Sequence, residues 1–138
     1  AALTCFSQGL TRCAVVKHEG LWGTGWDTHA GIGTQSAHFQ VLFTDLIAIQ
    51  EKLEQMPGEV EATLAEEVVV VVFSEMGRMP QTNSQGGKDH WTETSAMMYG
   101  PGVSGGQVID DYHRRTTFQV AISSLGRRVD EVVGRRLR

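Results

Sequence analysis

The stretch Val68-Val69-Val70-Val71-Val72-Phe73 decides the fold that the sequence predicts. Five β-branched residues in a row favour a strand, and because every position is apolar we expect both faces of that strand to be buried. Such a strand is typical of a parallel sheet covered by helices. Ser74 and Glu75 follow at once, so polar side chains lie where the strand ends.

The segment before the valine run has the spacing of a long helix. Apolar residues recur three or four positions apart from about Gln35, and Pro57-Gly58 marks the stop. Thr34 or Ser36 can cap the start. Farther upstream, the short apolar run Cys13–Lys17 predicts a buried strand, so strand, helix and strand make a βαβ unit. The apolar helix positions are Phe39, Leu42, Phe43, Leu46, Ile49 and Leu53.

Shorter elements are expected after the valine run. Ser95–Tyr99 predicts a strand, Gln107–Ile109 a short returning strand, and the glycine-rich segment Gly100–Gly106 a turn. Thr116–Ile122 is a further candidate strand and Arg127–Arg138 a candidate helix. The predicted fold class is α/β, an α/β/α sandwich with a mainly parallel sheet.

The charge of the chain changes sign near residue 112. Residues 1–112 carry 5 basic and 14 acidic side chains, whereas residues 113–138 carry 7 basic and 2 acidic ones. The basic end lacks interleaved aromatic residues, so we expect a solvated tail and no nucleic-acid binding. No apolar run is long enough to cross a bilayer. Cys5 and Cys13 have neither metal-knuckle nor redox spacing and are predicted to be small buried residues, with a disulfide as the alternative.

Three loops carry the candidate site residues. Asp27 and His29 stand two positions apart, so in an extended loop both side chains can face one ion. The alternative is an ordinary surface loop. Ser74, Glu75 and Arg78 follow the valine strand; Glu75 suits a metal, and Ser74 and Arg78 suit an anionic substrate. The alternative there is a Glu75–Arg78 ion pair.

The third loop is Gly86–Trp91. Its Asp89 and His90 are a second adjacent carboxylate and imidazole, with His90 favoured as a metal ligand and Asp89 as a ligand or supporting group, while Lys88 can hold an anion. An exposed turn is the alternative. Loops at the carboxyl ends of parallel strands meet at one edge, so the sequence predicts a shared site. Mixed nitrogen and oxygen donors favour zinc or manganese.

Other polar residues are assigned structural roles. His38 lies inside the predicted helix and His18 follows the first predicted strand, so both are expected to be structural; for His38 the alternative is that its side chain reaches the site. Ser104 lies in Gly102–Gly106, which fits the written nucleophile-elbow pattern but lacks a clean strand before it and a helix after it. A serine hydrolase using Ser104 is therefore a third, weaker hypothesis.

Five motifs in order resemble a bacterial family called domain of unknown function 1501, which is related to sulfatases and alkaline phosphatases. The resemblance implies an alkaline-phosphatase-like α/β/α sandwich whose loops hold one or two divalent metals for hydrolysis of phosphate or sulfate esters, in an exported protein. His90 resembles the late metal-binding histidine, and Asp27 and His29 resemble an earlier Asp and His sharing its ion. The motifs are Gly25–Ala30, Gln35–Phe39, Val70–Arg78, Gly86–His90 and Gly100–Gly106.

The chain also departs from that pattern. Ser74-Glu75 stands where the superfamily has an acidic-histidine pair, and nothing here matches its first strand, which carries a metal-binding Asp and the Ser or Thr nucleophile. We therefore expect residues 1–112 to be the C-terminal part of a sulfatase- or phosphatase-like domain that lacks the nucleophile strand, followed by a basic tail, 113–138. The alternative is a non-catalytic remnant that binds metal or serves as a structural or interaction module.

Overall fold

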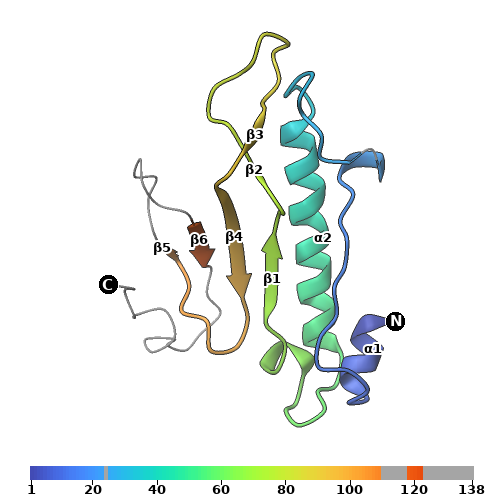
Figure 1. Cartoon of the computed structure of the whole chain (residues 1–138). Helices are drawn as coiled ribbons and strands as arrows, with labels where there is room; N and C mark the ends of the chain where they lie inside the picture. The colour runs from blue at the N-terminus through green and yellow to red at the C-terminus, as the bar shows by residue number, and fades with distance from the viewer. Residues whose placement is uncertain (24, 110–117, 123–138) are drawn as a thin grey trace.

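A computed structural model describes residues 1–23, 25–109 and 118–122, with residues 109 and 118–122 as backbone only. One long helix, α2 (Gln35–Gln55), runs beside the strands, and a short helix, α1 (Ala2–Ser7), lies near its C-terminal end (Figure 1). Two 3-10 turns are η1 (Leu21–Gly23) and η2 (Leu64–Glu66). The strands are β1 (Val70–Phe73), β2 (Gly77–Arg78), β3 (His90–Trp91), β4 (Thr94–Tyr99), β5 (Gln107–Ile109) and β6 (Phe118–Ile122).

The strands form two sheets whose pairing is mostly antiparallel. The larger sheet has the order β1-β4-β6-β5, and β2 pairs with β3 in a separate two-stranded sheet. β1 is antiparallel to β4, with Val70 opposite Tyr99, and β5 is antiparallel to β6. β4 and β6 form the one parallel pair in the described part of the chain.

The prediction of an α/β/α sandwich with a mainly parallel sheet is therefore wrong. The expected first strand does not form, because residues 13–17 are extended but pair with no strand among the described residues, and Val15 is 91% exposed. Without that strand there is no βαβ crossover. After β1 the chain passes through β2, a long loop and β3 and then enters β4. β4 therefore runs back beside β1 in the antiparallel direction.

Helix α2 confirms the predicted helix, but its apolar periodicity only in part, because two of the six predicted apolar positions are exposed. Its buried positions, His38, Leu46 and Leu53, are separated by seven or eight residues and so lie on one face. The helix ends at Gln55, and Met56 is extended, as expected for a residue that precedes proline. The buried apolar residues of the described chain are Leu46, Leu53, Leu64, Tyr99 and Val103.

The valine run forms a strand, but not one buried on both faces. Side chains of β1 alternate between partly buried and exposed, with Phe73 70% exposed. β1 is also an edge strand, since β4 is its partner on one side and no strand of the described chain pairs with the other. A second apolar row, Phe39, Phe43 and Ile47, is exposed on α2.

Several smaller predictions are settled by the structure. Strands form at Thr94–Tyr99, Gln107–Ile109 and Phe118–Ile122, and residues 100–106 form a turn and loop, as predicted. Both cysteines are free and Cys13 is exposed, so the expectation of two buried cysteines is wrong for Cys13. The predicted helix at 127–138 and most of the basic tail lie outside the described residues.

Two loops meet where α2 begins. The loop that leads into the helix and the long loop between β2 and β3 both lie at this end of the molecule (Figure 1). Within the described residues, no helix combines the length and apolar character needed to cross a membrane. The candidate site is therefore built from loops at one end of a small sheet and a single long helix.

Candidate functional site

Asp27 and His29 form a close pair in the loop before α2. Oδ1 of Asp27 accepts a hydrogen bond from the backbone N–H of His29 at 3.0 Å and also contacts ring atom Nδ1 of His29. In the tautomer that donates from Nδ1 to this carboxylate, Nε2 carries the lone pair. The backbone N–H and the ring of His29, with a smaller effect of Arg78, hold the pKa of the Asp27 carboxyl below its usual range.

Arg78 connects this pair to the second loop. Its Nη1 lies 3.0 Å from Nδ1 and 3.1 Å from Nε2 of His29, and Nη2 lies 3.4 Å from Asp27. Near-equal distances to both ring nitrogens place the guanidinium over the face of the imidazole, because an in-plane position would collide with the ring carbon between them. Nη1 also donates to the carbonyl of Lys88 at 3.0 Å. A lone pair on Nε2 would lie in the ring plane and so point away from the guanidinium.

His90 lies against His29. The two rings have centroids 4.5 Å apart and are tilted by 55°. The position of His90 follows from the β2–β3 pairing, in which Arg78 is directly opposite His90. An antiparallel pair of two-residue strands thus brings the guanidinium and the His90 imidazole to one place, beside His29.

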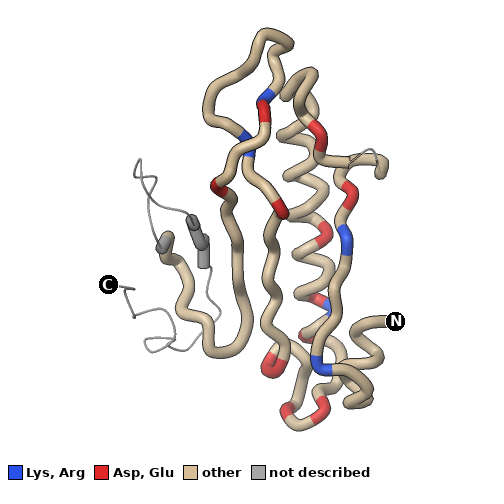
Figure 2. Tube along the Cα trace, in the orientation of Figure 1, with Lys and Arg blue, Asp and Glu red and all other residues tan. Residues whose placement is uncertain are grey.

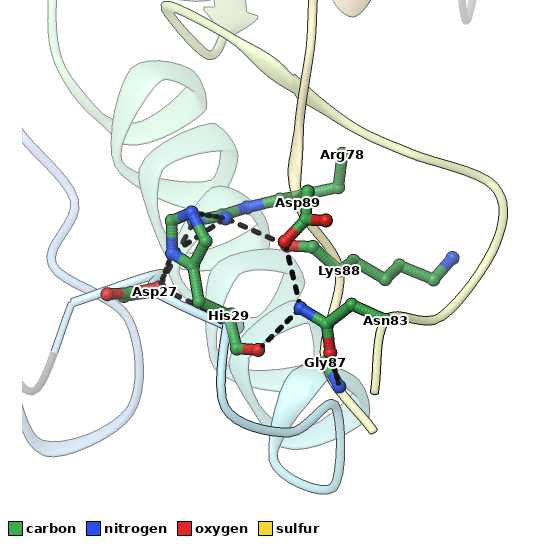
Figure 3. Close-up of polar contacts among 7 residues, drawn as sticks. All are labelled: Asp27, His29, Arg78, Asn83, Gly87, Lys88 and Asp89. Atoms are coloured by element: carbon green, nitrogen blue, oxygen red, sulfur yellow. Dashed lines mark hydrogen bonds and ion pairs between the residues drawn. The ribbon is translucent and has the colours of Figure 1, made fainter. Parts of the chain in front are cut away.

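Asn83 is the residue of this cluster that the sequence analysis missed. Its side chain contacts the carbonyl of His29 and the carboxylate of Asp89, as well as two N–H groups of its own turn (Figure 3). An Asn followed by a Gly-Gly pair is the signal that could have indicated such a turn. The Asp89 carboxylate is thus already engaged by an amide donor.

Gly87 lies at the closest approach of the two loops. A Cβ atom on Gly87 would overlap the backbone carbonyl groups of His29 and Thr28. The N–H of Lys88 donates to the carbonyl of Thr28 at 2.9 Å, which holds the same contact from the neighbouring residue. A glycine is therefore required where the loops meet.

The remaining predicted site residues lie less centrally. The Lys88 side chain extends away from His29, and its carbonyl is the part that faces Arg78 (Figure 3). Ser74 and Glu75 are exposed. A hydrogen bond to Glu19 chiefly raises the pKa of Lys17, and Glu75 adds a smaller contribution, so Glu75 acts on the segment around Lys17.

His38 and His18 support the loop, as predicted for structural histidines. Nδ1 of His38 accepts the backbone N–H of Leu21 at 2.8 Å, and the His38 side chain is buried. His18 contacts Asp45 at 3.1 Å through Nε2. Trp26 packs against both rings and donates from Nε1 to the carbonyl of His18 at 3.1 Å. This packing fixes the residue that directly precedes Asp27.

The charge around the cluster is locally mixed. Figure 2 shows acidic residues spread along α2 and the loops, whereas basic residues are few. Two of the five basic residues in the range 1–109, Arg78 and Lys88, belong to the cluster. In the arrangement seen, no three His, Cys, Asp or Glu side chains of the described residues are grouped so as to hold a metal ion.

The family described as protein of unknown function (DUF1501) matches residues 6–117. The chain belongs to this family. The match includes all three loops of the candidate site. No curated protein and no solved structure matches the chain.

Proposed function

We propose that the chain is a hydrolase-like domain for phosphate or sulfate esters that uses a divalent metal, zinc or manganese, held by His29, His90 and Asp27. The observation that carries the proposal is the adjacency of the two imidazoles, 4.5 Å apart, beside the Asp27 carboxylate. Two histidines and one carboxylate are a donor set that zinc takes in hydrolytic sites. The likeness of the motifs to sulfatases and alkaline phosphatases points the same way.

The side chains fit the ion by donor type, but binding requires a change of rotamers. Asp27 now engages Nδ1 of His29, and the two rings are tilted rather than directed at one point. A carboxylate on Nδ1 is a common support for a histidine that ligates through Nε2. A bound ion would polarise the ester and neutralise its negative charge.

Arg78 is proposed to hold the anionic group of the substrate. Its side chain is 19% exposed and lies beside Asp27 and His29, so its guanidinium is fixed in direction before any ligand binds. A planar guanidinium matches two oxygens of a phosphate or sulfate. Lys88, whose side chain extends away from His29, and Glu75, whose charge acts on Lys17, are left out of this proposal.

A metal-binding experiment tests the proposal. We expect the purified chain to bind Zn²⁺ or Mn²⁺ in isothermal titration calorimetry, and His29→Ala or His90→Ala to lose that binding. Asp45→Asn is the control, because it removes a carboxylate that pairs with a histidine ring, 3.1 Å away, but lies outside the cluster. Absence of metal binding by the unmodified chain would overturn the proposal.

A second candidate is a non-catalytic structural or interaction module. The exposed apolar row of Phe39, Phe43 and Ile47 on α2 favours it. These residues are four positions apart on one face of the helix, and an exposed row of large apolar side chains is typical of a surface that binds another protein or segment. Hydrolysis of p-nitrophenyl phosphate or p-nitrophenyl sulfate by the metal-loaded chain separates the two. Metal binding without turnover of either ester would favour the second candidate.

A further inference from the structure

The side chain of Asn83 uses its whole hydrogen-bonding capacity to join two loops. Nδ2 donates to the carbonyl of His29 at 2.9 Å and to Oδ1 of Asp89 at 2.8 Å (Figure 3). Oδ1 accepts the backbone N–H groups of Gln85 and Gly87, both at 3.0 Å. A carboxamide has two donor hydrogens and two acceptor lone pairs, so all four positions are filled.

The oxygen and the nitrogen of this amide do different things. The oxygen closes a turn within residues 83–87, which an aspartate could close equally well. The nitrogen reaches out of the turn, to the peptide of His29 in the first loop and to the residue before His90. Aspartate has no hydrogen to make these two contacts. The choice of asparagine is therefore explained by the contacts between the loops.

Those contacts act on the residues that carry the two imidazoles. Nδ2 of Asn83 holds the backbone carbonyl of His29. The same atom holds the carboxylate of Asp89, the residue directly before His90. The loops also meet through the Lys88 N–H and the Thr28 carbonyl, 2.9 Å apart. That backbone contact brings the loops together, but only the Asn83 amide contacts both His29 and Asp89 with one atom.

We propose that Asn83 is a positioning residue that sets the His29 and His90 rings against each other and keeps Asp89 as a supporting group beside them. Insofar as it concerns a metal centre, the inference rests on the proposed function. The placement of the two rings does not depend on it. Supporting residues around metal ligands typically change metal affinity by about 10- to 100-fold.

Asn83→Asp is the decisive single variant. It keeps the two acceptors that close the turn and removes the two donors. Its added negative charge would by itself strengthen cation binding, so a weaker affinity reports position and not charge. We expect Zn²⁺ to bind about 10- to 100-fold more weakly, with an altered visible spectrum of bound Co²⁺. Gln85→Glu, which adds the same charge to the same loop at an exposed position, is the control.

A charge-preserving double variant tests the Asp89 contact. Asn83→Asp with Asp89→Asn restores the hydrogen bond with donor and acceptor exchanged, so we expect it to recover part of the lost affinity. Asn83→Asp binding Zn²⁺ as tightly as the unmodified chain would overturn the proposal. So would a double variant no tighter than Asn83→Asp, because Asp89 would then act as a ligand itself.

Measurements on the metal-free chain separate this inference from the proposed function. Asn83→Asp should speed amide hydrogen exchange at Gly87 and Lys88 and shift the ring-proton resonances of His29 and His90. Unchanged exchange and ring shifts would overturn the positioning role even if the chain binds metal. Altered exchange and ring shifts in a chain that binds no metal would overturn the proposed function and leave the positioning role standing.

Discussion

The imidazoles of His29 and His90, 61 residues apart in the chain, lie with their centroids 4.5 Å apart. Arg78 contacts the first of these rings and is directly opposite His90 in the β2–β3 pair. The cluster therefore depends on the contact between the loop before α2 and the loop between β2 and β3. Substitutions that weaken this contact should therefore also disturb the site.

Gly87→Ala is expected to separate the loops. Its Cβ would overlap the carbonyl groups of His29 and Thr28, which are backbone atoms and cannot turn aside. We expect a loss of about 1–3 kcal/mol in the free energy of unfolding, measured by urea denaturation. Gly33→Ala is the control, because its Cβ would meet nothing within 4 Å. Equal effects of the two substitutions would contradict the close approach.

Arg78→Gln is expected to change metal and anion binding in opposite directions. Removing a fixed positive charge beside Asp27 and His29 should tighten Zn²⁺ binding by at least about tenfold. The same change should weaken binding of inorganic phosphate to the Zn²⁺-loaded chain, because the planar donor is lost. Calorimetry measures both affinities. Arg12→Gln, which removes an arginine paired with Glu59, should leave both unchanged.

Glu67 is expected to make the fold sensitive to acid. The backbone N–H groups of Glu61 and Val60, and then of Glu59, hold the pKa of the Glu67 carboxyl below its usual range. The native state thus favours the charged carboxylate. The resulting stability is present above the unfolded-state pKa and is lost as the pH falls through the depressed native pKa.

Glu67→Gln should remove that dependence. Thermal midpoints measured between neutral and strongly acidic pH should fall less steeply for the variant than for the unmodified chain. Glu51→Gln, at an exposed position of α2, should leave the pH profile as it is. A Glu67→Gln profile parallel to that of the unmodified chain would show that the three N–H contacts do not matter in solution.

Leu64→Ala tests the small core. Leu64 is fully buried beneath the C-terminal half of α2, so its truncation should cost about 2–5 kcal/mol of unfolding free energy. Leu10→Ala removes the same atoms from a side chain that is 70% exposed and should change stability by no more than about 0.5 kcal/mol. Urea denaturation of both variants and the unmodified chain measures the two changes in unfolding free energy. A small effect at Leu64 would show that the core is loosely packed.

Helix α2 could be predicted because its signals are local. Apolar residues recur with helical spacing for about four turns, and Pro57 lies just beyond the end. The valine run could be predicted as a strand for the same reason. The strand that pairs with it could not be predicted, because the two partners of a strand pair lie far apart in the sequence. Cys13–Lys17 has the composition of a strand but remains a single extended segment.

The structure brings several of the predicted site residues together, but by another geometry than the one predicted, and Ser74 and Glu75 lie outside the cluster. Spacing alone suggested that Asp27 and His29 share a side, and they contact each other. The expected convergence at the carboxyl ends of parallel strands does not occur. The β2–β3 pair and the Asn83 contacts bring Arg78 and His90 to His29 instead, and such hydrogen bonds depend on a turn that composition does not specify. Metal binding remains a prediction.

The unpaired side of β1 has a practical consequence for anyone who purifies this chain. Alternate residues of this four-residue apolar strand direct backbone N–H and C=O groups away from β4, where no strand of the described residues pairs with them, and Val71 and Phe73 are exposed. Such an edge can add a strand from a neighbouring molecule, and repeated addition builds cross-β fibrils. We expect turbidity and thioflavin fluorescence to rise with protein concentration. A lysine in place of Val71 should keep the solutions clear.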